Sequence, residues 1–278
     1  MVKDVLNRKE ALEFLALDEK LFDNYWRAAK EFSGEKIRGR WYFSKDKLSD
    51  WKKSFEWRTV YLSRDDYNLC LDFALAMHFR GYVLSDWGTG RQREFGQKLT
   101  NWVKGQLGEV AVKKFLKDKF NFDVVLDFNI HSKIVPQDII GVREGKKNRI
   151  PKIGIGIKSS KPKNSALVLG QNEIEIESRG SDVYIFCRPD IPDDHLLRVS
   201  KEEIIESVKD KPHFETYKVK IPSFEKIPCE ISGFCYKKEL KKVTSIPGQV
   251  FENGYRYVRF SGELNRDKKE WERLISKI

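Results

Sequence analysis

Apolar residues recur at helical spacing in parts of the chain and form short continuous runs elsewhere, and the two patterns predict different elements. Helical spacing marks residues 8–15 and 17–22, and again residues 66–79, where Arg80 and Gly81 close the pattern. The longest helix is expected from about Gly96 to Lys117. Its apolar stripe comprises Leu99, Val103, Leu107 and Val110.

Four short apolar runs after this helix predict β-strands. They cover residues 122–126, 134–140, 153–157 and 183–187. A helix, three strands, a helix-like segment and a further strand indicate a mixed α/β core. Surface helices are expected at residues 201–209 and 266–278, and strand-like segments alternate with turns from about Tyr217 onward.

The length of 278 residues accommodates one large domain or two modest ones. We place a boundary near residue 90, between a mainly helical N-terminal region (1–90) and a larger region (91–278). No run approaches the roughly 20 apolar residues of a membrane span, which excludes an integral membrane protein. The chain opens into a charged, helix-like stretch with no signal-peptide pattern, so we expect a cytoplasmic protein. Its four cysteines lack CxxC spacing, which argues against zinc ribbons and iron–sulfur clusters.

The formal net charge of +11 points to a polyanion, with nucleic acid as the first candidate and an anionic membrane surface as the second. Aromatic and basic residues interleave at 38–43 and 51–58, a pattern that suits stacking on bases. The alternative for these aromatic residues is core packing, which is their commoner use.

The densest positive charge surrounds two apolar runs that we expect to form adjacent strands. Asp138 belongs to the first run and Lys158 follows the second, across a basic connection from Gly141 to Ile153. Between Arg143 and Lys163 the chain carries eight basic residues against one acid, Glu144. A carboxylate within that much positive charge suits a site where a phosphate backbone meets a divalent metal.

These residues resemble the PD-(D/E)xK nuclease superfamily, which has the restriction-endonuclease-like fold, a mixed β-sheet flanked by helices. The resemblance covers roughly residues 96–198. It lies in the helix motif Gly105-Gln106-Leu107-Gly108-Glu109, in Asp138 of Pro136-Gln137-Asp138, and in Lys158 of Gly156-Ile157-Lys158. The segments at 172–175 and 181–186 are similar to the following helix and strand of that fold.

One departure concerns Gly156, which stands where the superfamily normally places an acid two residues before the lysine. In one group of type II restriction enzymes a glutamate on the following helix supplies the missing carboxylate. Glu173 falls 15 residues after Lys158 and is the best replacement, with Glu175 in reserve. That group also carries an Arg-acid-Arg recognition run, which Pro162-Lys163-Asn164 replaces here, so its base specificity is not carried over.

The resemblance implies a Mg²⁺ site made by Asp138, Glu173 and the Ile157 carbonyl, with Glu109 assisting, and Lys158 holding the attacking water. Structural alternatives are a strand-end turn for Asp138, a helix start for Glu173 and an exposed salt-bridge partner for Glu109. The expected DNA contacts are Arg91, Arg93, Lys98, Lys146, Lys147, Arg149, Lys161 and Lys163.

The sequence therefore predicts a Mg²⁺-dependent type II restriction endonuclease that cuts double-stranded DNA. A palindromic target would call for a homodimer, since two-fold DNA calls for two-fold protein. Two alternatives stay open. One is another nuclease of the same superfamily acting in repair or defence, and the other is a decayed enzyme that binds DNA without cutting it.

Overall fold

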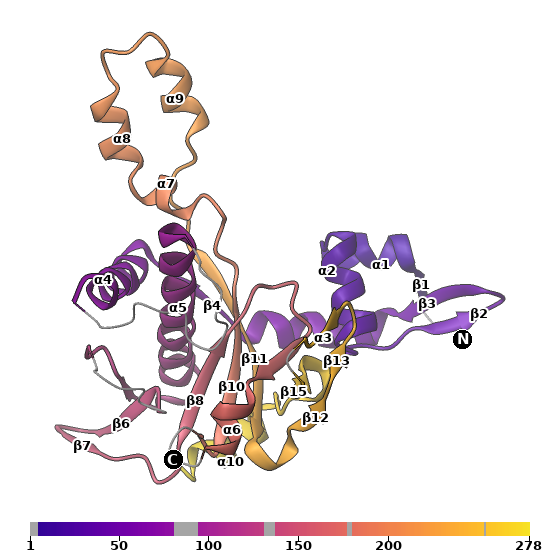
Figure 1. Ribbon diagram of the computed structural model, residues 1–278. Coiled ribbons are helices and arrows are strands. Elements are labelled where there is room, and N and C mark those ends of the chain that lie inside the picture. Colours follow the sequence, from indigo (N-terminus) through magenta and orange to yellow (C-terminus); the bar gives the residue numbers. More distant parts are fainter. Residues whose placement is uncertain (1–4, 81–93, 131–136, 177–179, 253) are drawn as a thin grey trace.

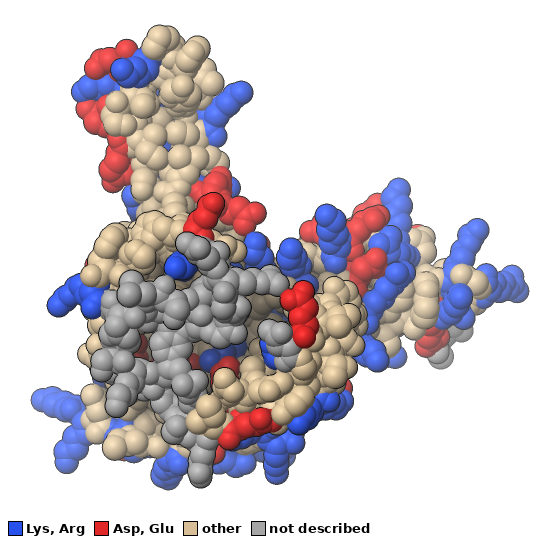
Figure 2. Space-filling model, viewed as in Figure 1, with Lys and Arg blue, Asp and Glu red and all other residues tan. Residues whose placement is uncertain are grey.

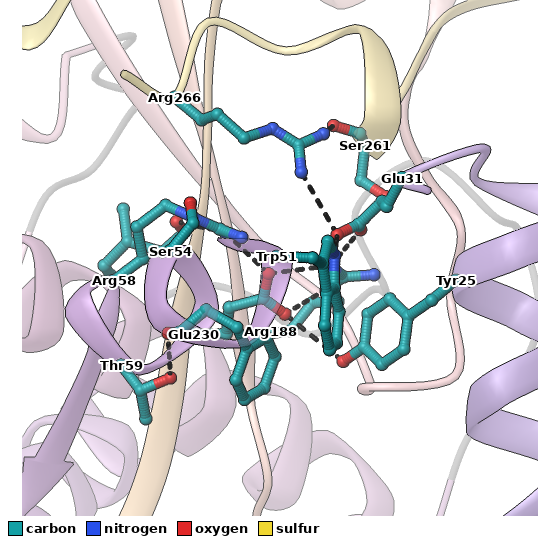
Figure 3. Close-up of polar contacts among 12 residues, drawn as sticks. Tyr25, Glu31, Trp51, Ser54, Arg58, Thr59, Arg188, Glu230, Ser261 and Arg266 are labelled. Atoms are coloured by element: carbon teal, nitrogen blue, oxygen red, sulfur yellow. Dashed lines mark hydrogen bonds and ion pairs between the residues drawn. The ribbon is translucent and has the colours of Figure 1, made fainter. Parts of the chain in front are cut away.

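The computed structural model describes residues 5–80, 94–130, 137–176, 180–252 and 254–278. Its hydrophobic residues gather chiefly in two cores. A buried cluster of charged side chains lies between the segments that carry these cores (Figure 3). We call residues 5–57 the N-terminal module. The rest of the chain surrounds a four-stranded sheet, which we call the central sheet.

The N-terminal module combines short helices with a small antiparallel sheet around a core of aromatic rings. Its elements are β1 (Val5–Asn7), α1 (Arg8–Leu15), α2 (Glu19–Asp23), η1 (Asn24–Ala28), β2 (Glu35–Ile37), β3 (Arg40–Ser44) and α3 (Lys45–Trp57). Phe22 packs 5.2 Å from Phe43, and Phe32 packs 5.2 Å from Trp51, measured between ring centroids. Most of these aromatic residues are therefore core, and the three strands are an addition to the helices that the sequence predicted.

The central sheet has the strand order β4-β11-β10-β8. Its members are β4 (Thr59–Leu62), β8 (Ile155–Ser159), β10 (Val183–Pro189) and β11 (Ile227–Tyr236). β8 runs parallel to β10, whereas β11 is antiparallel to both β10 and β4. Every residue of β10 is buried, as expected for a strand covered on both faces. The mixed α/β class predicted from the sequence is confirmed.

Two helices cover one face of this sheet. α5 (Phe95–Phe120) lies across the sheet and α4 (Arg64–Arg80) packs beside α5, so both predicted helices are confirmed (Figure 1). α5 approaches β8 closely because residue 108 is glycine: a Cβ there would lie 1.9 Å from the Ser159 hydroxyl oxygen. None of the helices in the described ranges is long and apolar enough to cross a membrane.

A second antiparallel sheet, with the order β5-β6-β7, adjoins the edge of β8. It comprises β5 (Val124–Leu126), β6 (Ile139–Glu144) and β7 (Lys147–Arg149). The basic connection expected from Gly141 to Ile153 is thus largely a hairpin, which turns at Gly145 with a φ of 62°. The Glu-Gly-Lys sequence at this turn was the available signal, because glycine adopts positive φ without strain.

The remaining elements extend the fold on two sides. A third sheet holds β9 (Ala166–Leu169), β12 (Lys241–Val243) and β15 (Arg256–Phe260), and α6 (Gln171–Glu175) follows β9; β13 (Ser245–Ile246) pairs with β14 (Gln249–Val250). Between β10 and β11 the chain forms a projecting arm of α7 (His195–Val199), α8 (Lys201–Ser207) and α9 (Phe214–Lys220) (Figure 1). The last helix is α10 (Lys268–Ile275).

The position of the domain boundary was predicted near residue 90. Residues of β4 and α4 belong to the same hydrophobic core as the central sheet, so residues 59–80 pack with the larger core. The boundary near residue 90 stays a prediction.

The N-terminal module joins the central sheet through an interface cluster, which we define as Glu31, Arg58, Arg188, Glu230 and Arg266 (Figure 3). Arg188 donates to both Glu230 carboxylate oxygens, at 2.8 and 2.9 Å, and to Glu31 at 2.7 Å. Arg58 donates to Glu230 at 2.7 Å, and Arg266 lies 3.2 Å from Glu31. Since Glu31 comes from the module and Arg188 from β10, these ion pairs hold the two parts together.

Candidate active site

Asp138 is anchored directly to the free edge of β8. Its backbone N–H donates to the Ile155 carbonyl at 3.1 Å, and its carboxylate accepts from the Ile157 N–H at 2.5 Å. Gln137 adds a third bond by accepting from the Ile155 N–H at 2.8 Å. The N–H and C=O of a strand residue point to the same side, so the Ile157 carbonyl also faces Asp138. Asp138 directly precedes β6, whereas the sequence predicted it within a strand.

Lys158 lies on the face of β8 opposite α5, where it meets helix α6. Its Nζ pairs with the Glu173 carboxylate at 2.7 Å. Glu175 turns away and accepts a hydrogen bond from Tyr257 at 2.9 Å and another from Tyr255. The geometry therefore brings Glu173, and not Glu175, to Lys158.

Glu109 approaches from the other side, on α5. It is only 8% exposed, so the interpretation of Glu109 as an exposed salt-bridge partner is wrong. Gln106, one turn earlier, donates to its carboxylate at 2.9 Å. The closeness of α5 to β8, which Gly108 permits, is what buries this carboxylate beside the sheet edge.

A side chain at position 156, where the superfamily places an acid, would be tightly crowded. A Cβ there would lie 3.0 Å from the Ser181 hydroxyl oxygen and 3.1 Å from the Tyr184 ring. Tyr184 is fully buried and accepts a hydrogen bond from the Ser181 N–H at 3.0 Å. The space on this face of β8 is thus filled by a fixed aromatic ring.

Carboxylates outnumber cations around this edge, and the pKa values reflect it. Burial, then the neighbouring charge of Asp138, raises the pKa of Glu109 well above its usual range. Burial also raises the pKa of Asp138, although Lys158 and the Ile157 N–H act in the opposite direction. For Lys158, burial disfavours the charged form, but Glu173 and Asp138 outweigh it and raise its pKa. Lys158 is therefore charged at neutral pH.

Asp127 is a further carboxylate of this group that the sequence analysis missed. Its N–H donates to the Asp138 carbonyl at 3.4 Å, and its negative charge raises the pKa of both Glu109 and Asp138. Asp127 comes directly after β5, and an acid at a strand end was the only signal that could have found it.

The donor set is suited to magnesium. In the described parts of the chain, no group of three or more His, Cys, Asp or Glu side chains is arranged to hold a metal ion. Magnesium, however, is commonly held by one or two carboxylates together with substrate phosphates and water, so it does not need such a group. Asp138, Glu173 and the Ile157 carbonyl, with Glu109 on the other side, offer the hard oxygen donors that Mg²⁺ prefers.

The basic residues predicted to contact DNA fall into several places. Arg91 and Arg93 lie outside the described residues. Lys146 and Lys147 are exposed on the β6–β7 hairpin, and Lys161 and Lys163 are exposed just beyond β8. Lys98 is half-buried on the first turn of α5. Arg149 instead binds Glu144 and the Ile278 carbonyl, at 2.5 and 2.6 Å, which gives it a structural partner.

Comparison with known proteins adds no relative: no family model, no curated protein and no solved structure matches this chain. The assignment of a function therefore rests on the geometry of the site.

Proposed function

We propose that the protein is a Mg²⁺-dependent endonuclease that hydrolyses phosphodiester bonds in double-stranded DNA, acting in the cytoplasm as a type II restriction enzyme. The observation that carries the proposal is the arrangement at β8, where Asp138 binds the Ile157 N–H and Lys158 pairs with Glu173. The chain order α5, β5, β6, β7, β8, β9, α6, β10 supports it, because without the short strands β7 and β9 this order resembles that of the restriction-endonuclease-like core.

The residues would act from the two faces of β8. Lys158, kept charged by Glu173 and Asp138, would hold the attacking water and stabilise the negative charge that develops on the phosphate. Glu173 would take the place of the acid missing at Gly156. Asp138, Glu173 and the Ile157 carbonyl would hold Mg²⁺, with Glu109 assisting from α5. When bound, this ion supplies Lewis-acid activation of the phosphate and neutralises its charge.

The substrate follows from the charge around the site. Lys146, Lys147, Lys161 and Lys163 lie close to β8 in the chain, where they can neutralise phosphates of a duplex. A palindromic target would be cut by two copies of the chain.

Digestion of supercoiled plasmid DNA tests the proposal. We expect Mg²⁺-dependent linear fragments from the wild type, and a rate lower by about 10²- to 10³-fold in Lys158→Ala, as for loss of one group that stabilises the transition state. Lys201→Ala is the matched control, because it removes a lysine that is half-buried like Lys158 but lies on the projecting arm, away from the site. Tight DNA binding without cleavage under any divalent metal would overturn the proposal in favour of a decayed enzyme that only binds DNA.

A further inference from the structure

The β2–β3 hairpin of the N-terminal module projects from the molecule as a narrow ribbon (Figure 1). Its strands pair from Glu35–Tyr42 to Ile37–Arg40, and the two residues between them, Arg38 and Gly39, have φ values of 46° and 82°. Positive φ at both central positions defines a tight two-residue hairpin turn. All seven residues from Glu35 to Trp41 are exposed.

This ribbon carries positive charge that the protein itself does not neutralise. Among the described residues, none of Lys36, Arg38 and Arg40 forms an ion pair or a side-chain hydrogen bond. Lys and Arg side chains crowd this end of the molecule in Figure 2. Exposed arginines without acidic partners at the tip of a hairpin leave an anion-binding surface.

Aromatic packing at the base stiffens the ribbon. Trp41 is 37% exposed, and its ring packs edge-on against Trp26 at 4.9 Å between centroids. The Arg27 guanidinium also packs on Trp26, 4.6 Å from its ring centroid. Phe43, two residues after Trp41, is fully buried in the module core. The strand is therefore fixed at one end and free at its charged tip.

The interface cluster fixes the ribbon relative to the candidate active site. Glu31 lies four residues before β2 and binds Arg188 of β10, the strand that pairs with β8 (Figure 3). A contact made by the ribbon would thus position the same DNA molecule that the site cuts.

We propose that the β2–β3 ribbon enters the major groove of duplex DNA, with Arg38 and Arg40 contacting base edges and phosphates. The inference rests on the proposed function and names the element that reads its substrate. The major groove admits a two-stranded β-ribbon, whereas the minor groove is about half as wide. Arginine is also the side chain that pairs best with the two major-groove acceptors of guanine.

Fluorescence anisotropy on a labelled plasmid-derived DNA duplex, with EDTA present, tests this inference. We expect Arg38→Gln/Arg40→Gln to weaken binding by about tenfold or more and to lower the salt slope by about one for each phosphate that the variant no longer neutralises. The control is Lys268→Gln/Arg273→Gln, which removes the same charge from exposed side chains of α10 and should bind like the wild type. Unchanged thermal melting of both variants excludes misfolding.

Altered DNA identifies the groove. 7-Deazaguanine lacks the N7 acceptor of guanine. We expect the wild type to bind a duplex with 7-deazaguanine less tightly than normal DNA. The ribbon variant should bind the two duplexes equally well. Netropsin, which fills the minor groove, should not displace the ribbon. Equal binding by the ribbon variant and the control, or release by netropsin with no effect of 7-deazaguanine, would overturn the inference. The proposed function fails separately, if the wild type binds DNA through the ribbon but cuts none with Mg²⁺.

Discussion

Two buried groups of charged residues lie against the central sheet, and they are balanced in opposite ways. The interface cluster places three arginines around two glutamates, so Arg188, Arg266 and Arg58 overcome burial and lower the pKa of Glu31 to about 2. The candidate active site groups four carboxylates with a single cation, Lys158, and the pKa values of two of them, Asp138 and Glu109, are raised. The other two carboxylates belong to Glu173, which pairs with Lys158, and to Asp127, which acts on Asp138 and Glu109.

Under the proposed function, the contrast separates a structural use of buried charge from a chemical one. In the interface cluster each carboxylate has guanidinium partners within the protein, so the charges contribute to the joint between the two cores. In the candidate site the single lysine does not offset the burial and mutual repulsion of the carboxylates, so a bound cation would stabilise their charged forms. Perturbed pKa values of that second kind mark functional sites more often than ion pairs do.

The largest effect should follow from breaking the balanced cluster. Arg188→Met leaves Glu31 and Glu230 buried with too few partners, and we expect a loss of about 3–5 kcal/mol in the free energy of unfolding. Urea denaturation measures it. Asp138→Asn is the counterpart in the candidate site, and should leave stability unchanged or raised because it relieves repulsion. Equal destabilisation by the two variants would show that both clusters are structural.

The second-largest effect on the free energy of unfolding should come from acidification, which weakens the interface cluster. The pKa of Glu31 is about 2 in the folded protein against 4.5 ordinarily, so its stabilising contribution is complete above about pH 5 and is lost as the pH falls from 4.5 toward 2. At about 1.36 kcal/mol for each pKa unit, the contribution is about 3 kcal/mol. Unfolding curves recorded over this pH range should fall less steeply for Glu31→Gln than for the wild type. Parallel curves would show that Glu31 does not contribute to the pH dependence of the free energy of unfolding.

The two glutamates of α6 should differ in activity. Glu173→Gln removes the partner of Lys158, and we expect the rate of DNA cleavage to fall on the order of 10- to 100-fold, as when a group supporting a metal site is removed. Glu175→Gln, which weakens hydrogen bonds from Tyr255 and Tyr257 and an ion pair with Lys242, should cut at nearly the wild-type rate. The opposite ranking would place the acid that replaces Gly156 at residue 175.

The smallest effect is expected at Asp127. Asp127→Asn removes one negative charge near Glu109 and Asp138 without touching Lys158, so the Mg²⁺ concentration for half-maximal cleavage should rise several-fold, or about 1 kcal/mol. A Mg²⁺ titration of the cleavage rate measures the change. An unaltered Mg²⁺ titration would show that Asp127 does not contribute to Mg²⁺ binding. The candidate functional carboxylates would then be those predicted from the sequence.

Much of the core could be predicted because local pattern decides it. The helices at 66–79 and 96–117 and the strands at 153–157 and 183–187 are long or strongly apolar, and each appears within a few residues of its expected bounds. The hairpin within residues 141–153 and the strands of the N-terminal module were missed. Their strands are short and polar, and pairing rather than propensity stabilises them.

The candidate active site, too, could be predicted from the sequence only in part. The order and spacing of Asp138, Lys158 and Glu173 could be read from the chain alone, together with the glycine that breaks the superfamily pattern. The choice between Glu173 and Glu175 could not, since both lie in one five-residue helix, and it depends on Tyr255 and Tyr257, some 80 residues away, which hold Glu175.

The sequence by itself determined the residues on which the proposed chemistry rests: a basic chain with one acid and one lysine at the ends of two apolar runs. Only the tertiary structure decided which charges are satisfied. Arg58, Arg188 and Glu230 are far apart in the chain and meet within the interface, whereas Glu109 is buried because Gly108 lets α5 approach β8. Burial and distance set the pKa of a carboxylate, and neither can be read from residue order.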